Sequence, residues 1–293
     1  MRIAVTGLHG QVVTSLIERG RGVADIVPLG RPDLDLADRG SVLRAIAATN
    51  CEVVVNAAAY TAVDKAEDEI DLAMAINGAG AGHVAEAARI AEAPVLHLST
   101  DYVFDGQLDR PYREDDPTGP AGAYGRTKLE GERCVQASGA DSIILRTAWV
   151  YSPFGTNFVR TMLRLGETRP EVAVVADQQG NPTNALDIAD ALLAIAARLK
   201  QDRAPALRGV FHMTGRGEAV WADVAQATFE AAEHCGRKPV GVKRIGTADY
   251  PTRTARPANS RLDNTKLRKA YGIELPHWRM SLPDVVERLL KPN

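Results

Sequence analysis

Val95-Leu96-His97-Leu98-Ser99-Thr100-Asp101 decides the fold, because a short apolar segment ends there in two hydroxyls and a carboxylate. Residues 95–98 follow Pro94 and have the length and apolarity of a buried strand. In an open α/β sheet, ligands bind at the carboxyl ends of the strands. We therefore expect the hydroxyls of Ser99 and Thr100 to lie at a ligand site.

Tyr124 and Lys128 follow in a segment, 123–137, that we expect to be helical. Residues four apart lie on one face of a helix. A free tyrosine has a pKa of about 10, and a neighbouring ammonium lowers that pKa toward the working range of a proton donor and acceptor. Thr100, Tyr124 and Lys128 are thus a candidate site for proton transfer to a carbonyl oxygen. An ordinary surface pair of Tyr124 and Lys128 is the alternative.

The first residues predict a strand, a glycine-containing turn and a helix. A strand over 2–5 is followed by Thr6-Gly7-Leu8-His9-Gly10 and by a helical pattern over 14–19. Gly7 permits a tight turn, and Gly10 lets the backbone approach a pyrophosphate, which a helix N-terminus attracts. Val13 stands where a third glycine is usual, and a plain strand-to-helix turn is the alternative.

Arg31 bears on the choice of cofactor. A second strand over 24–29 ends at Gly30-Arg31-Pro32, where dinucleotide-binding folds place the residue that reads the adenosine ribose. An arginine suits the 2′-phosphate of NADP, and a carboxylate suits the free 2′-hydroxyl of NAD. Arg31 favours NADPH, with NADH possible because Asp33 and Asp35 lie close by; a merely solvated Arg31 is the alternative.

Strands alternate with helices up to residue 100, which predicts a parallel, doubly wound sheet of the Rossmann type. Further strands are expected at 52–55, 142–146, 172–175 and 210–213, and helices at 41–48 (with Ser41 a possible cap), 67–91, 158–166, 187–200, 221–235 and 282–290. We expect a nucleotide-binding domain over 1–155, completed by about 172–202 and 240–262. The remainder of 156–293 would form a smaller, interleaved substrate-binding domain.

Composition excludes several classes of protein. The chain has 293 residues, 45% hydrophobic and 25% charged, with a net charge of −2, so no basic footprint for nucleic acid is visible. Cys51, Cys134 and Cys235 lie far apart, which favours a reducing compartment over disulfides or a zinc site. No signal peptide or membrane-spanning run is visible, so we expect a cytoplasmic protein.

Several stretches together resemble the extended short-chain dehydrogenase/reductases, and in particular the dTDP-4-dehydrorhamnose reductase family. They are Gly7-x-x-Gly10, Asn56-Ala57-Ala58-Ala59, Ser99-Thr100-Asp101-Tyr102-Val103-Phe104-Asp105-Gly106, Tyr124-Gly125-Arg126-Thr127-Lys128, Val63-Asp64-Lys65-Ala66-Glu67, Gly180-Asn181-Pro182-Thr183 and Arg256-Pro257-Ala258-Asn259-Ser260. The resemblance runs from residue 1 to about 290.

The resemblance implies NADPH- or NADH-dependent reduction of the 4-keto group of dTDP-6-deoxy-L-lyxo-4-hexulose to dTDP-L-rhamnose. Tyr124 would protonate the C4 oxygen, Lys128 would lower the pKa of Tyr124 and hold the nicotinamide ribose, and Thr100 would orient the carbonyl. The implied cofactor contacts are Gly7, Gly10, Gln11 and Val12 (pyrophosphate), Asp35 and Leu36 (adenine), Ala58, Ala59 and Tyr60 (nicotinamide half), and Ser99. The implied substrate contacts are Thr61, Thr100, Asp101, Tyr102, Val103 and Trp149; for Trp149, core packing is the alternative.

Ser15 marks a departure from the family pattern. Some members dimerise through a magnesium ion held by acidic residues, one of them on the first helix, and Ser15 occupies that position here. We therefore expect no metal and a monomer or weak homodimer. Another nucleotide-sugar 4-ketoreductase is the alternative within this fold. A non-catalytic protein similar to the regulatory subunit of methionine adenosyltransferase is the alternative outside enzymes.

Overall fold

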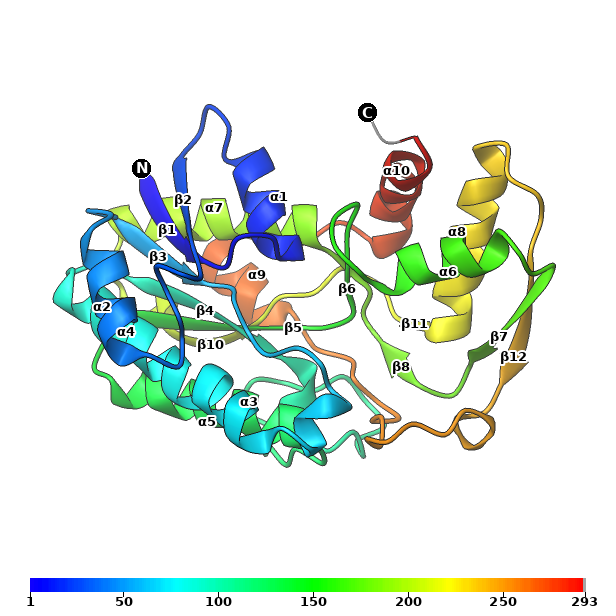
Figure 1. Ribbon diagram of the computed structural model, residues 1–293, viewed down its shortest axis with the longest axis horizontal. Coiled ribbons are helices and arrows are strands. Elements are labelled where there is room, and N and C mark those ends of the chain that lie inside the picture. Colours follow the sequence, from blue (N-terminus) through cyan, green and yellow to red (C-terminus); the bar gives the residue numbers. More distant parts are fainter. Residues whose placement is uncertain (292–293) are drawn as a thin grey trace.

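A six-stranded parallel sheet forms one half of the molecule (Figure 1), which is a computed structural model describing residues 1–291. Its strand order is β10-β5-β4-β3-β1-β2, and all five neighbouring pairs are parallel. The strands are β1 (Arg2–Thr6), β2 (Asp25–Leu29), β3 (Val53–Asn56), β4 (Val95–Thr100), β5 (Ser142–Thr147) and β10 (Gly209–His212). The predicted doubly wound α/β sheet is confirmed.

Helices cover both faces of this sheet (Figure 1). Successive residues of a strand point to opposite faces, so Ile3 and Val5 enter one core while Ala4 enters the other. The first core lies under α1 (Gln11–Arg19) and α7 (Ala185–Gln201). The second lies under α2 (Arg39–Ala47), α4 (Gly80–Ile90) and α5 (Ala123–Ala137). The strand order changes direction between β1 and β3, because β2 lies on one side of β1 and β3 lies on the other. Sheets of this kind bind ligands at that point.

Two predicted helices differ from the structure. Helix α2 is capped by Asp38, whose carboxylate accepts from the Gly40 amide at 2.9 Å, and not by Ser41. The helix expected over 67–91 is present over residues 70–90, as α3 (Ile70–Met74), the π-helical turn η2 (Ala75–Ala79) and α4, and the 3₁₀ turn η1 (Lys65–Glu67) precedes it. Asn77, inside the π turn, bonds to both backbone groups of Tyr60, at 2.8 and 3.0 Å.

The other half of the molecule packs α6 (Phe158–Gly166), α8 (Trp221–His234) and α10 (Trp278–Leu290) together. Here β7 (Glu171–Val175) pairs with β12 (Gly241–Ile245), outside the six-stranded sheet. The domain limits given in the sequence analysis remain a prediction. The pairing of β7 with β12 places residues 171–175 beside residues 241–245, in a sheet separate from the six-stranded one. The remaining elements are η3 (Asp101–Val103), β6 (Val150–Tyr151), β8 (Gln179–Gly180), β9 (Thr183–Asn184), η4 (Pro205–Leu207), β11 (Ala219–Val220), η5 (Thr247–Asp249) and α9 (Thr265–Tyr271).

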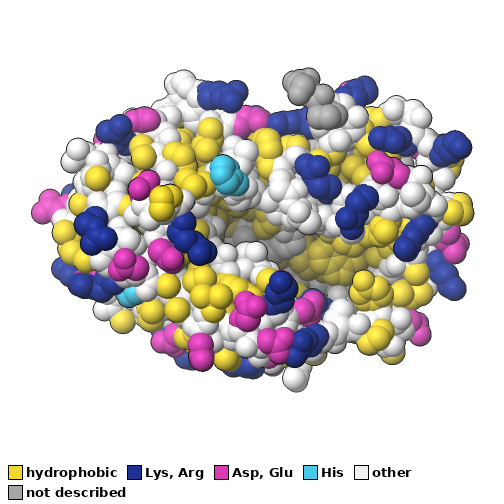
Figure 2. Space-filling model, in the orientation of Figure 1, with side chains coloured by type: hydrophobic (Ala, Val, Ile, Leu, Met, Phe, Trp, Pro, Cys, Tyr) yellow, Lys and Arg dark blue, Asp and Glu magenta, His cyan; other side chains and the backbone are white. Residues whose placement is uncertain are grey.

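Figure 2 shows that the face drawn is hollowed between the two halves, with hydrophobic side chains gathered on the side of α6 and α8. The carboxyl ends of the sheet strands and the start of α5 supply the site residues described below. Within residues 1–291, no helix combines the length and apolarity needed to cross a lipid bilayer.

Candidate active site

Thr100 and Tyr124 lie together at the carboxyl end of β4. Thr100 is the last residue of β4, and its hydroxyl accepts from the Tyr102 amide at 3.2 Å and donates to the Asp101 carboxylate at 2.9 Å. Tyr124 is the second residue of α5, and its ring meets that of Tyr102 edge to face, with centroids 5.6 Å apart. The Thr100 hydroxyl is close enough to act on the pKa of the Tyr124 phenol, which it lowers. The structure therefore brings a phenol and an alcohol to one point.

The pKa of Tyr124 moves in the direction opposite to the one predicted. Burial raises it above its ordinary value, and the negative charge of Asp101 adds to the rise, which outweighs the effect of Thr100. The Lys128 ammonium, which we expected to lower this pKa, instead donates to the Leu98 carbonyl at 2.7 Å. Tyr124 is consequently a protonated phenol at neutral pH, and that is the form a proton donor needs.

Lys128 is a buried ammonium with a carboxylate one helical turn away. Its side chain is almost fully inaccessible. Burial lowers the pKa of Lys128 to about 8, and the charge of Glu132 opposes that shift. A buried lysine with a pKa close to the working range is a common feature of functional sites.

Asp101 adds a second titratable group beside the phenol. Its side chain is buried, and burial raises the pKa of its carboxyl to about 6, against hydrogen bonds from Ser260 and Thr100. Ser260 lies in the stretch Arg256–Ser260, which Arg256 ties to Asp64 through an ion pair of 2.6 Å. Two of the motifs behind the family resemblance thus meet over the end of β4.

A cavity of about 300 Å³ lies at the ends of β1, β2 and β3, which is within the size range of small-molecule sites. Six of the predicted cofactor residues line it: Gly7, Arg31, Asp35, Leu36, Ala58 and Ala59. Gly7 has a φ of +103°, which only glycine adopts readily, and a Cβ there would press on Val13 at 3.1 Å. Among the described residues, the first turn of α1 has no acidic side chain. Its amide groups can therefore receive a phosphate.

Arg31 is exposed at this cavity, and its guanidinium lies 3.9 Å from the Asp35 carboxylate. An arginine, which suits the 2′-phosphate of NADP, and a carboxylate, which suits the free 2′-hydroxyl of NAD, are therefore both present at one site. The arginine side chain is 74% exposed, which leaves it free to approach a phosphate. The structure thus places the residue from which the preference for NADPH was predicted at the mouth of the cavity.

The other predicted cofactor residues make contacts within the protein. The Gln11 carboxamide oxygen accepts from Ser152 at 2.7 Å and Asn157 at 3.1 Å, which ties the start of α1 to the loop before α6. Half-buried Val12 packs against the core beneath the sheet, Gly10 caps α1, and the Tyr60 hydroxyl donates to Glu69. The Ser99 hydroxyl donates to Glu132 at 2.5 Å, so its side chain points into the protein and any cofactor contact falls to its backbone.

The predicted substrate residues differ in accessibility. Thr61 is exposed and Tyr102 is half-buried, with a pKa raised by burial to about 12. Val103 is fully buried in a cluster with Phe104, so its side chain belongs to the core. Trp149 is half-buried and stacks on Trp221, a residue that the sequence analysis did not select for the site.

A buried ion pair one helical turn from Lys128 was also not predicted from the sequence. Arg146 of β5 donates to both carboxylate oxygens of Glu132, at 2.9 and 2.7 Å, and both side chains are at most 5% exposed. Two charged residues on separate elements gave no local signal that they would pair. The one clue in the sequence was a charged residue directly after the apolar run of residues 143–145 in this strand.

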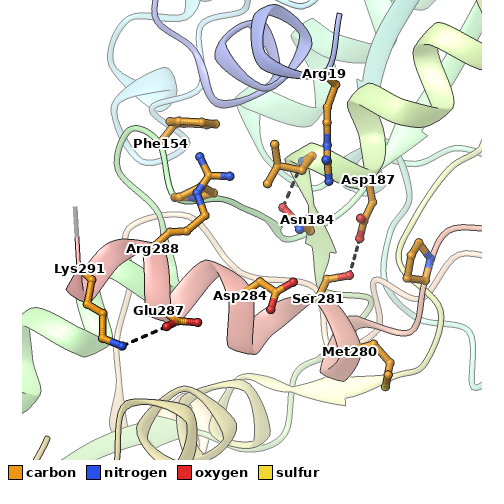
Figure 3. A pocket seen from close by; sticks show the side chains of 13 residues that line it. Arg19, Phe154, Asn184, Asp187, Met280, Ser281, Asp284, Glu287, Arg288 and Lys291 are labelled. Carbon is orange, nitrogen blue, oxygen red and sulfur yellow. Dashed lines mark hydrogen bonds and ion pairs between the residues drawn. The ribbon is translucent and has the colours of Figure 1, made fainter. Parts of the chain in front are cut away.

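Figure 3 shows a larger cavity, of about 870 Å³, between α1, α7 and α10. Asp187 accepts there from Ser281 at 2.7 Å, and Glu287 pairs with Lys291. This cavity contains none of the predicted site residues. In residues 1–291, no group of histidine, cysteine, aspartate or glutamate side chains is arranged to hold a metal ion.

Comparison with known proteins links this geometry to a family. Residues 1–291 match the family model described as the RmlD substrate binding domain. The dTDP-4-dehydrorhamnose reductase of Sinorhizobium fredii is 48% identical over 290 residues, covering 99% of this chain and 98% of the relative. The crystal structure of a dTDP-4-dehydrorhamnose reductase from Clostridium acetobutylicum is 37% identical, with a TM-score of 0.91 over 99% of this chain and all of the other. The enzyme from Bacillus anthracis, solved in complex with NADP, is 33% identical with a TM-score of 0.89, over 97% and 98% of the two chains.

Proposed function

The chain belongs to the dTDP-4-dehydrorhamnose reductase family, and from this premise we propose that it reduces the 4-keto group of dTDP-6-deoxy-L-lyxo-4-hexulose with NADPH, giving dTDP-L-rhamnose. The observation that carries the proposal is the meeting of Thr100 and Tyr124 at the end of β4, with Lys128 one helical turn further along α5. The alternative of a non-catalytic binding protein has less support, because this set of proton-transfer residues is intact.

The roles of these residues follow from their protonation states. Tyr124 holds its proton at neutral pH and donates it to the C4 oxygen of the ketone. Thr100 orients that oxygen with its hydroxyl. Lys128 carries the buried positive charge that favours an oxyanion and binds the nicotinamide ribose. A bound reduced nicotinamide supplies the hydride.

The cofactor would lie along the carboxyl ends of β1, β2 and β3. Gly7, Gly10, Gln11 and Val12 hold the pyrophosphate, and the cavity beside Arg31 takes the adenosine end. Arg31 binds the 2′-phosphate of NADPH. NADH remains a usable but poorer cofactor, because Asp35 can accept from a free 2′-hydroxyl.

The test is to incubate the protein with NADPH and dTDP-6-deoxy-L-lyxo-4-hexulose while following the absorbance of the reduced nicotinamide. We expect oxidation that requires the keto sugar and that falls about 10²–10⁴-fold in Tyr124→Phe. Tyr250→Phe, at an exposed tyrosine outside the site, is the matched control and keeps full turnover. Full activity of Tyr124→Phe would reject the assignment. Faster turnover of UDP- or GDP-linked keto sugars would point to another nucleotide-sugar 4-ketoreductase.

We further propose that the protein works in the cytoplasm as a monomer or weak homodimer without a bound metal or nucleic acid. The support is its net charge of −2, its three free cysteines and Ser15 at the position where some family members carry a metal-binding acid.

A further inference from the structure

Trp149 adopts a backbone conformation that bulky residues rarely occupy. It lies two residues beyond the end of β5, and its φ is +48°, in the left-handed region. Such a conformation persists where the surroundings hold the residue firmly, often at ligand sites. The contacts that hold Trp149 should therefore matter for whatever binds there.

The indole of Trp221, the first residue of α8, supplies one of these contacts. The two rings are parallel within 8°, with centroids 3.6 Å apart. Phe158 of α6 lies behind Trp221, with ring centroids 4.6 Å apart. The three aromatic residues come from separate elements, so the stack forms only when both halves of the molecule are in place.

Gly180 leaves room for the same ring. A Cβ at Gly180 would overlap the Trp149 indole, and the Thr183 amide donates to the Trp149 carbonyl at 3.2 Å. The stretch 180–183 was singled out above as a motif without an assigned task. Its first and last residues fix the side chain and the backbone of Trp149.

Trp149 also touches the segment that follows the catalytic threonine. It packs against the cluster that holds Val103 and Phe104, directly after Thr100 and Asp101. Its partner Trp221 packs into the core of the other half, beside Val172 and Ala225. The Trp149–Trp221 stack therefore joins the end of β4 to the half built from α6 and α8.

We propose that Trp221 is a positioning residue for nucleotide-sugar binding, acting through Trp149. Its indole holds Trp149 in the left-handed conformation and fixes the spacing of the two halves across the hollow in which the substrate binds. This inference rests on the proposed function for the identity of the substrate. Because the stack includes none of the residues proposed to transfer the proton, we expect it to act on binding and not on the proton-transfer step.

The first experiment detects the stacking of Trp149 on Trp221 in the absence of substrate. The chain has three tryptophans, so in Trp278→Phe only Trp149 and Trp221 contribute to the tryptophan emission. In that background, Trp221→Ala should uncover one face of Trp149 and increase the quenching of its fluorescence by acrylamide, whereas Trp221→Phe should not. Equal quenching in the two variants would overturn the proposed stack.

The second experiment measures its consequence. Trp221→Ala should raise the KM for the keto sugar about tenfold, the factor that corresponds to losing one aromatic pair. The kcat and the KM for NADPH should stay unchanged, and Trp221→Phe should restore most of the loss. An unchanged KM for the sugar, or an equal fall in kcat for both variants, would overturn the inference. Should Trp221→Ala fail to fold by circular dichroism, Trp221→Leu, which fills more of the space, replaces it.

Calorimetric binding of dTDP separates this inference from the proposed function. If the wild-type protein binds dTDP but reduces no keto sugar, the proposed function fails, while weaker dTDP binding by Trp221→Ala still supports the positioning role. If wild-type and Trp221→Ala bind dTDP equally, the positioning role fails whatever the protein reduces.

Discussion

Glu132→Gln is the substitution whose effect on stability the structure defines most sharply. Arg146 donates to both oxygens of the Glu132 carboxylate, and Ser99 donates to one of them. The two charged side chains are 3% and 5% exposed. A glutamine keeps the size of the side chain but removes the charge that balances Arg146.

The expected loss in the free energy of unfolding is about 3–5 kcal/mol, because removing one partner of a buried pair leaves the other charge uncompensated. Few other groups can compensate the charge of Arg146. Within residues 1–291 its Nη1 has no hydrogen-bond partner, and its guanidinium otherwise lies over the Phe104 ring at 5.0 Å. Such a loss is a large share of the 5–15 kcal/mol by which folded proteins are typically stable.

Urea unfolding at pH 7, followed by circular dichroism, measures the change. Asp141→Asn is the matched control, because Asp141 pairs with Arg208 through a carboxylate that is 43% exposed; it should cost less than about 1 kcal/mol. Glu132→Leu combined with Arg146→Met should recover much of the loss, since the charge of Arg146 is then not left unpaired. If Glu132→Gln costs no more than Asp141→Asn, the reasoning about the buried pair is wrong.

Three further outcomes are expected. Arg31→Ala should lower the ratio of NADPH to NADH kcat/KM by about 10–100-fold, because a charge-assisted hydrogen bond contributes about 1.5–3 kcal/mol; an unchanged ratio would remove Arg31 from cofactor choice. The Asp101 pKa of about 6 lies above the ordinary value of about 3.9, so its stabilising contribution is complete below about pH 4 and is lost as pH rises through 6. Asp101→Asn should therefore remove about 3 kcal/mol of pH dependence from the free energy of unfolding, measured by urea titration between pH 4 and 7. Gly131→Ala should cost about 1–3 kcal/mol in the same assay, because its Cβ would overlap the Asn77 carbonyl oxygen; wild-type stability would show that α5 can move away.

The sheet was predictable from sequence because its strands are short apolar runs separated by helical patterns. Helix α5 begins and ends where the pattern placed it, at 123 and 137. The helix expected over 67–91 was confirmed over residues 70–90, but its π turn was not predicted, because alanine-rich composition favours an α-helix in every part of it. The π turn contains Asn77, which bonds to Tyr60 in a contact between segments that no local pattern reports.

The arrangement of Tyr124 and Lys128 on one helix could be predicted from the sequence, but the electrostatics around them could not. Spacing placed Tyr124 and Lys128 on one helix, and the structure agrees. The direction of the Tyr124 pKa depends on what surrounds the phenol, and burial near Asp101 decides it. Trp221 was missed for a related reason: a tryptophan at the start of a helix shows nothing about the ring it will face 72 positions away in the chain.

The glycines of α5 explain how its functional side chains reach their positions. A Cβ at Gly125 would overlap the Tyr102 carbonyl oxygen in η3, and one at Gly131 would overlap the π turn. Because both positions lack a Cβ, the helix backbone contacts two separate segments directly. That contact sets Tyr124 beside the end of β4 and brings Lys128 within 2.7 Å of the Leu98 carbonyl. In the stretch from 124 to 132, the tyrosine and lysine are the residues proposed to carry the chemistry, and the glycines set how closely their helix approaches η3 and the π turn.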